Sequence, residues 1–204
     1  MSNETGLVTQ ERAKITDEQM ALLKRMMCPD ATDDEMKLYE NQINRTQLDP
    51  FARQIYAIKR WNSAVKAKVM QVQVSIDGFR LIAQRSNEYR GQSGPFWCGQ
   101  DGVWKDVWLS ADYPAAAKVG VWRTGFQEPV WGVALWREYA VYDINNKLSS
   151  MWEKMPANQL SKCAEMLGER KAFPQELSGL YGTEEMGQAD NPTITVTKDR
   201  KSVV

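Results

Sequence analysis

Hydrophobic and polar residues alternate along residues 69–76, in the first half of the chain. Every second position is apolar and the positions between are mostly Gln or Ser, the apolar set being Met70, Val72, Val74 and Ile76. A period of two is typical of a half-buried strand. Residues 54–58 form a shorter candidate strand, so the two segments predict a β-hairpin whose tip is residues 59–68.

Helical patterns lie on both sides of this hairpin. Thr16 with Gln19, and Thr32 with Glu35, have the spacing of capping boxes, and they predict helices that end near residues 27 and 46. A short helix should begin at Asp77. Residues 156–172 predict a long amphipathic helix that has proline at its start and an apolar stripe of Leu160, Cys163, Ala164 and Leu167.

Between these helices, residues 89–142 indicate antiparallel β-structure. A hairpin is expected around Gln100-Asp101-Gly102, with further strands at 120–123 and 130–136. The predicted fold is therefore α+β: an antiparallel sheet with a projecting basic hairpin, packed by the N-terminal helices and the long helix of the C-terminal half.

Length and composition indicate one domain. The chain has 204 residues, of which 43% are hydrophobic, and we expect a core domain over 15–188 with disordered ends at 1–14 and 189–204. No apolar run approaches the roughly 18 residues that a membrane span requires. The polar N-terminus has no signal-peptide pattern, so a cytoplasmic location is expected.

Positive charge is local, because the formal net charge of the whole chain is zero. Residues 48–84 contain six cations against two carboxylates, Asp49 and Asp77, and such a segment suits the phosphates of a nucleic acid. A solvated turn whose lysines protect an edge strand is the alternative interpretation. The six cations are Arg53, Lys59, Arg60, Lys66, Lys68 and Arg80.

The long helix offers a second set of cations, namely Lys154, Lys162, Arg170 and Lys171. Glu165 and Glu169 dilute this charge, so a mixed-charge surface helix remains an alternative. Tryptophans of the β-region could stack on bases or pack the sheet or a subunit interface; they are Trp97, Trp104, Trp108, Trp122, Trp131 and Trp136.

Several classes of chemistry are excluded. The chain has no histidine and three widely spaced cysteines, which removes triad-type nucleophiles, imidazole ligands and a zinc site. No phosphate-binding loop is present. The remaining enzyme hypothesis is a Mg²⁺-dependent nuclease that would use carboxylates from Asp77, Asp101, Asp106, Glu184 and Glu185.

Five segments, in order, resemble the phage Bet/RecT family of single-strand DNA annealing proteins. They are LDPFARQIYAIKR, QVSIDGFRLIAQR, WCGQDGVWKDVW, MWEKMP and KCAEMLGERKAFPQELSGLYGTEEM. The resemblance covers roughly residues 15–188. It implies ATP-independent annealing by a non-enzymatic recombinase that forms oligomeric rings or helical filaments, with no catalytic residue and no cofactor, Mg²⁺ being compatible but not required.

The resemblance also implies partners and DNA contacts. The partners are single-stranded DNA, the annealed duplex, other copies of the chain, a phage exonuclease and the host single-strand-binding protein. The expected DNA contacts are the ten cations named above, and a single-strand-binding protein that protects without annealing remains an alternative. Residues 157–159 lack the cations that a family member carries there, so this helix face should bind DNA less densely.

The two N-terminal helices are expected to pack neighbouring subunits together, because they carry apolar residues and little positive charge. These apolar residues are Leu22, Leu23, Met26, Met36 and Tyr39.

Overall fold

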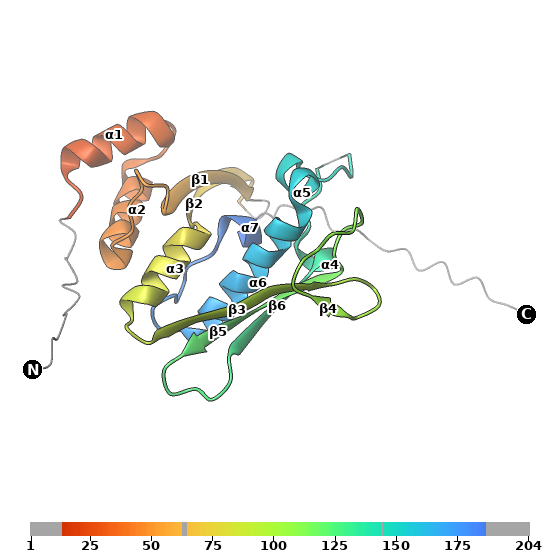
Figure 1. Cartoon of the computed structure of the whole chain (residues 1–204). Coiled ribbons are helices and arrows are strands. Elements are labelled where there is room, and N and C mark those ends of the chain that lie inside the picture. Colours follow the sequence, from red (N-terminus) through yellow and green to blue (C-terminus); the bar gives the residue numbers. More distant parts are fainter. Residues whose placement is uncertain (1–13, 63–64, 144, 187–204) are drawn as a thin grey trace, which may run out of the picture.

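A four-stranded antiparallel sheet and one long helix form the centre of the molecule (Figure 1). The computed structural model describes residues 14–62, 65–143 and 145–186. The strand order is β4-β3-β5-β6, and the helix is α6, Pro156–Ala172. The strands span Tyr89–Cys98 (β3), Trp104–Lys105 (β4), Ala116–Arg123 (β5) and Val130–Leu135 (β6).

Helix α6 lies directly on β5 and β6 because glycines remove the side chains between them. A Cβ atom on Gly132 of β6 would overlap the backbone of α6 at Ala164 and Gly168. The inward residues Ala117 and Val119 of β5 pack beside this contact, in a cluster with Leu160, Cys163 and Ala164. The predicted apolar stripe is thus confirmed as the buried face of α6.

The predicted hairpin forms a separate two-stranded sheet. Strand β1, Ile55–Asn62, pairs antiparallel with β2, Ala67–Val74, in a register that runs from Ile55 opposite Val74 to Asn62 opposite Ala67. The strands are longer at the tip than predicted, so Lys59, Arg60 and Lys68 lie on strands and not in a loop. Continued cross-strand pairing keeps these residues extended, and this corrects the predicted tip of residues 59–68.

Helix α3, Ile76–Arg85, follows the hairpin and packs on α6. The Ser75 hydroxyl accepts a hydrogen bond from the Gly78 amide, which caps the first turn. A Cβ atom on Gly78 would lie 2.5 Å from the carbonyl oxygen of Gln54. Glycine here therefore lets α3 approach the start of the hairpin. Phe79, Ile82 and Ala83 face the core, as the sequence predicted.

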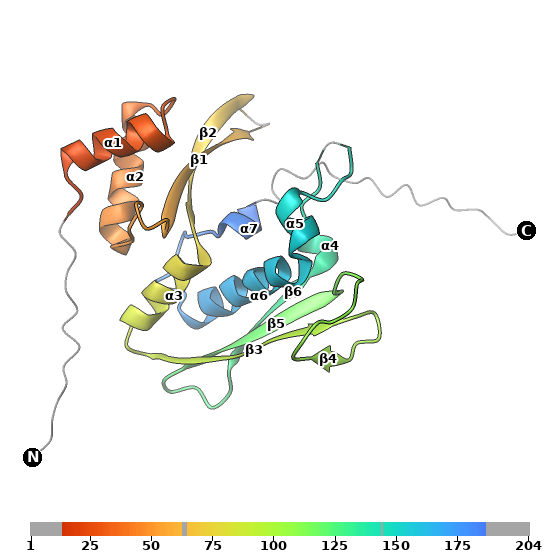
Figure 2. The same cartoon turned by 45° about the horizontal axis from the view of Figure 1, so that its top comes forward.

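Both N-terminal capping boxes are present. They start α1, Asp17–Met27, and α2, Asp33–Thr46. These helices pack beside the hairpin, away from the four-stranded sheet (Figure 2). Leu23, Met36 and Tyr39 are buried in the subunit core. The prediction that these three residues pack against other subunits is therefore wrong, because they belong to the same buried cluster as Ile55 and Val74 of the hairpin.

The remaining helices are short: α4, Trp136–Tyr139, α5, Ser150–Lys154, and α7, Thr183–Met186. Within the described ranges no helix has the length and apolarity needed to cross a membrane. The α+β class with antiparallel sheets is confirmed. The ends predicted to be disordered, 1–14 and 189–204, lie outside the described residues apart from residue 14.

Candidate nucleic-acid interface

The β1-β2 hairpin has two faces with different neighbours. Opposed residues of an antiparallel pair share a face, so Lys59 shares one with Met70 while Arg60 points to the other. The Lys59 ammonium lies 3.1 Å from a carboxylate oxygen of Glu35, and Glu35 also accepts a hydrogen bond from the Met70 amide. The first face is therefore tied to α2.

The second face of the hairpin looks toward α6 across a cavity of about 260 Å³. Tyr56 and Ile58 line it from β1 and Lys162 from α6. Ser75, Ile76, Asp77, Thr183 and Glu184 complete the lining. Of the ten predicted cations, Lys162 is the one that lines this cavity among the described residues.

The segment of residues 181–186, which includes α7, lies between the hairpin and α6. The carbonyl oxygen of Tyr181 accepts a hydrogen bond of 2.9 Å from the Val74 amide at the end of β2. On the same side the Arg60 guanidinium donates to the carbonyl oxygen of Met186 at 3.3 Å. This segment therefore continues the hairpin sheet toward α6, with a parallel bridge between Val74 and Gly182.

The two glutamates of α7 face cations of α6. Glu184 pairs with Lys162 at 3.3 Å, and Glu185 pairs with Arg170. The Arg170 guanidinium also stacks near the Tyr181 ring, 5.1 Å from its centroid. Lys162 and Arg170, two of the predicted phosphate-binding residues, thus pair with carboxylates in this structure.

Arg80 is held even more firmly by carboxylates. Its guanidinium donates to both oxygens of Glu165, at 2.6 and 2.8 Å, and to Asp77 at 3.1 Å. The hydrogen bonds to Glu165 raise the pKa of Arg80 above its ordinary value. A phosphate would have to displace a bidentate carboxylate to reach this residue.

Glu169 lies one helical turn from Glu165, and its side chain is fully buried. Neither carboxylate oxygen has a hydrogen-bond partner among the described residues. Burial, and after it the nearby charge of Glu165, raise the pKa of Glu169 to about 9. The carboxyl group is therefore protonated at neutral pH and adds no negative charge to the core.

Four predicted cations are exposed and have no ion pair or side-chain hydrogen bond within the described ranges. Arg53 and Lys66 adopt positive φ angles of 58° and 50° at the two ends of the hairpin. Lys68 lies on β2 next to the tip, and Lys154 lies at the end of α5. Lys171, the tenth cation, donates to the carbonyl oxygen of Trp131 at 3.1 Å.

Of the carboxylates of the nuclease hypothesis, Asp77 and Glu184 line the cavity between the hairpin and α6. Asp77 pairs with Arg80, and Asp101 lies 4.0 Å from Lys105 in the β3-β4 turn. In the parts of the chain that the structure describes, no group of three or more potential ligands could hold a metal ion. The three cysteines are free and buried.

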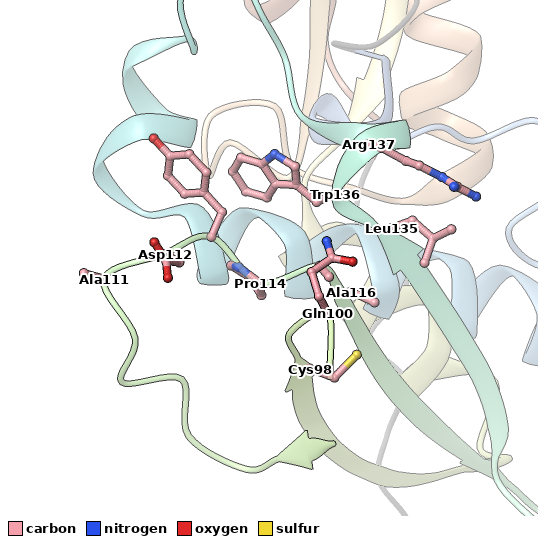
Figure 3. A pocket seen from close by; sticks show the side chains of 11 residues that line it. Cys98, Gln100, Ala111, Asp112, Pro114, Ala116, Leu135, Trp136 and Arg137 are labelled. Carbon is pink, nitrogen blue, oxygen red and sulfur yellow. The ribbon is translucent and has the colours of Figure 1, made fainter. Parts of the chain in front are cut away.

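A cavity of about 790 Å³ lies at the far end of the sheet (Figure 3). Its wall includes Tyr113 and Trp136, whose rings stack with centroids 4.5 Å apart and an interplanar angle of 7°. Cys98, Ala116 and Leu135 form its base on three neighbouring strands. The sequence did not predict this cavity, because the loop 106–115 that covers it has no periodic pattern.

Lys118 is a cation that the sequence reasoning missed. It points outward from β5, and its ammonium lies 4.4 Å from the ring centroid of Trp104 and 4.9 Å from that of Trp131. The alternation of buried Ala117 and Val119 with Lys118 and Gly120 along β5 is the signal that could have placed it on the open face.

Comparison with known proteins identifies a family. The sequence model of the RecT family matches residues 13–197, which is nearly the whole chain. No curated protein matches the chain.

Proposed function

The chain belongs to the RecT family, and on that premise we propose that it anneals complementary DNA strands without ATP. Family membership makes it a DNA-binding protein of phage-type recombination that acts by single-strand annealing. The absence of a phosphate-binding loop in the sequence supports independence from nucleotides. We propose no catalytic step and no required Mg²⁺ ion.

The observation that carries the location of the site is the space between the hairpin and α6. Lys162 of α6 lines this space, Arg60 of the hairpin donates to Met186 beside it, and the exposed Lys66 and Lys68 extend the positive charge to the hairpin tip. We propose that the backbone of one strand follows this path. Phosphate contacts carry affinity without sequence information, and they leave the Watson-Crick edges accessible to a complementary strand.

Assembly is the second part of the proposal. RecT-family proteins bind single-stranded DNA and form oligomers, and we propose a ring or a helical filament for this chain. A zero net charge and few unpaired cations per subunit favour weak binding by one subunit. Sites repeated along one strand would raise the avidity by a factor on the order of 10² to 10⁴. A phage exonuclease and the host single-strand-binding protein are proposed partners.

The experiment measures annealing of two complementary oligonucleotides without nucleotide, with and without Mg²⁺. The protein should accelerate pairing, and the Lys66→Ala/Lys68→Ala variant should anneal more slowly. On a single strand this variant should lower the salt slope of binding by about 0.7 for each lost phosphate contact. Lys37→Ala is the matched control, because Lys37 is an exposed lysine of α2 on the other side of the hairpin.

The outcomes separate the alternatives. Cleavage of a strand in Mg²⁺ would indicate a nuclease, and tight binding without faster pairing would indicate a protecting protein. An unchanged salt slope in the double variant would mean that both lysines are solvated surface residues and contact no phosphate.

A further inference from the structure

No helix of the described residues lies on one face of the four-stranded sheet. In both views α3 and α6 lie on the same side of β3, β5 and β6 (Figures 1 and 2). Residues that point to the other side remain accessible, with 36% of Trp131 and 43% of Val133 exposed on β6. Large contiguous apolar patches on a protein surface often mark interaction sites.

Four residues on this face form a group that we call the aromatic platform: Phe96, Trp104, Lys118 and Trp131. The strand register places Phe96 of β3 beside Lys118 of β5. The Lys118 ammonium lies within 5.6 Å of the ring centroids of all three aromatic residues. Across the described ranges no carboxylate forms an ion pair with Lys118.

A glycine supports this arrangement. A Cβ atom on Gly120 would lie 3.1 Å from Cη2 and Cζ3 of Trp131, which is opposite it on β6. The indole of Trp131 therefore lies over the backbone of β5, a position that any larger residue at 120 would crowd. Trp104, which is 38% exposed, lies on the other side of Lys118. Two accessible indoles thus flank one accessible ammonium.

The charge of Lys118 decides which partner suits the platform. A second protein that covered this face with apolar groups would bury an unpaired ammonium, which costs several kcal/mol. A nucleotide suits the same group better, because its phosphate can pair with the ammonium while its base stacks on an indole. Base–aromatic stacking tolerates any sequence, since every base has a π-face.

We propose that the aromatic platform is a second binding site for single-stranded DNA, on the side of the sheet opposite the hairpin and α6. Lys118 contacts a phosphate, and the indoles of Trp104 and Trp131 stack on bases. A strand segment outside the main path would be held here. This inference rests on the proposed function, because that function supplies single-stranded DNA as the ligand.

The first test uses photocrosslinking, which requires no variant. A dT oligonucleotide that carries 5-iododeoxyuridine is irradiated with the full-length protein, and the crosslinked peptide is identified by mass spectrometry. The expected crosslinks are to Trp131 or Trp104. Crosslinks confined to residues around the hairpin and α6, such as Tyr56, would overturn the inference.

The second test compares a dT oligonucleotide with an abasic oligonucleotide of the same length. The wild type should bind the dT strand more tightly, and Trp131→Ala should reduce that preference on the order of tenfold. Lys118→Met should lower the salt slope by about 0.7, whereas Lys147→Met at an exposed turn should not. Trp131→Phe keeps an aromatic ring and should retain part of the preference, which separates stacking from loss of the fold.

Two outcomes are diagnostic of failure. If Trp131→Ala and Lys118→Met bind dT like the wild type but change the oligomer size, the platform is a subunit interface and the inference is wrong. If the wild type binds no single-stranded DNA, the proposed function fails as well. Binding that depends on Lys66 and Lys68 but not on the platform would refute this inference alone.

Discussion

Glu169 is the residue whose environment most clearly departs from what its side chain prefers in water. Its folded-state pKa of about 9 lies above the ordinary value of 4.5. The folded protein therefore binds one more proton than the unfolded chain between these two values. The contribution of this proton to the free energy of unfolding should be fully present below about pH 4.5. It should be lost as the pH rises toward 9, by at most about 1.4 kcal/mol per pH unit.

Glu169→Gln should remove this pH dependence, because the amide stays neutral in both states. At about pH 8 the free energy of unfolding of the variant should exceed that of the wild type, by at most about 5 kcal/mol. The difference should shrink below about pH 5. Urea unfolding at several pH values measures it, with Glu153→Gln on the exposed surface of α5 as the control. A wild type whose stability rises from pH 5 to 8 would contradict the assignment.

Single residues also show what the sequence could not reveal about the cations. The distribution of positive charge was evident, but the carboxylates that neutralise it come from distant positions. Arg80 meets Glu165, 85 residues away, and Lys162 meets Glu184 across the turn that follows α6. Such pairs depend on tertiary packing, so neither spacing nor composition predicts them.

At the scale of elements, α7 lies where the phosphate backbone of a DNA strand would interact favourably with Lys162. Its Glu184 carboxylate holds Lys162 next to the cavity between the hairpin and α6. A strand that uses Lys162 must compete with this carboxylate. The contact should therefore lower the affinity for DNA.

Glu184→Gln should raise the affinity for a single strand severalfold, because it removes a negative charge near the phosphates. A charge pair near a protein surface is worth a few kcal/mol at most and less in salt. The effect should accordingly be larger at low ionic strength. Fluorescence anisotropy at two salt concentrations measures it, with Glu153→Gln as a matched loss of one exposed carboxylate. Weaker binding of Glu184→Gln would mean that Glu184 orients Lys162 for DNA.

Element boundaries were predictable where local chemistry fixes them. The capping boxes at Thr16 and Thr32 and the proline at 156 correctly marked the starts of α1, α2 and α6. The hairpin tip was predicted too long because charged residues were taken as a loop signal, although cross-strand pairing continues to Asn62 and Ala67. The open face of the four-stranded sheet was not predicted, because the sequence alone does not show which tryptophans face the core.

At the scale of the whole molecule, apolar side chains on the N-terminal helices remain uncovered. Met26 of α1 is 74% exposed and Leu38 of α2 is 63% exposed. Met26, which was predicted, and Leu38, which was not, are therefore the candidates for contacts between subunits in place of Leu23 and Met36. An exposed position also allows substitution with little effect on the fold, typically within about 0.5 kcal/mol.

The variant Met26→Asp/Leu38→Asp should form smaller oligomers and anneal more slowly while its circular dichroism stays unchanged. Loss of avidity is the reason, since single subunits hold a strand weakly. Mass photometry and the annealing assay measure both effects. Leu109→Asp is the control, because Leu109 is 89% exposed in the loop over the large cavity. A monomeric variant that anneals at the wild-type rate would separate assembly from function.

The glycine contact between α6 and β6 has a mechanical consequence. Where two backbones touch with no side chain between them, the helix cannot roll or slide without steric overlap, so α6 and the sheet must move as one stiff unit. The hairpin has a described contact of this kind only at its base, where Gly78 of α3 lies against the carbonyl oxygen of Gln54; beyond its base it is joined to its neighbours through side chains and the extended segment before α7. Widening the path for a strand therefore requires the hairpin to pivot while α6 stays still. The unit of α6 and the four-stranded sheet would then set the spacing between successive subunits along DNA. The hairpin would set how tightly each subunit holds the strand.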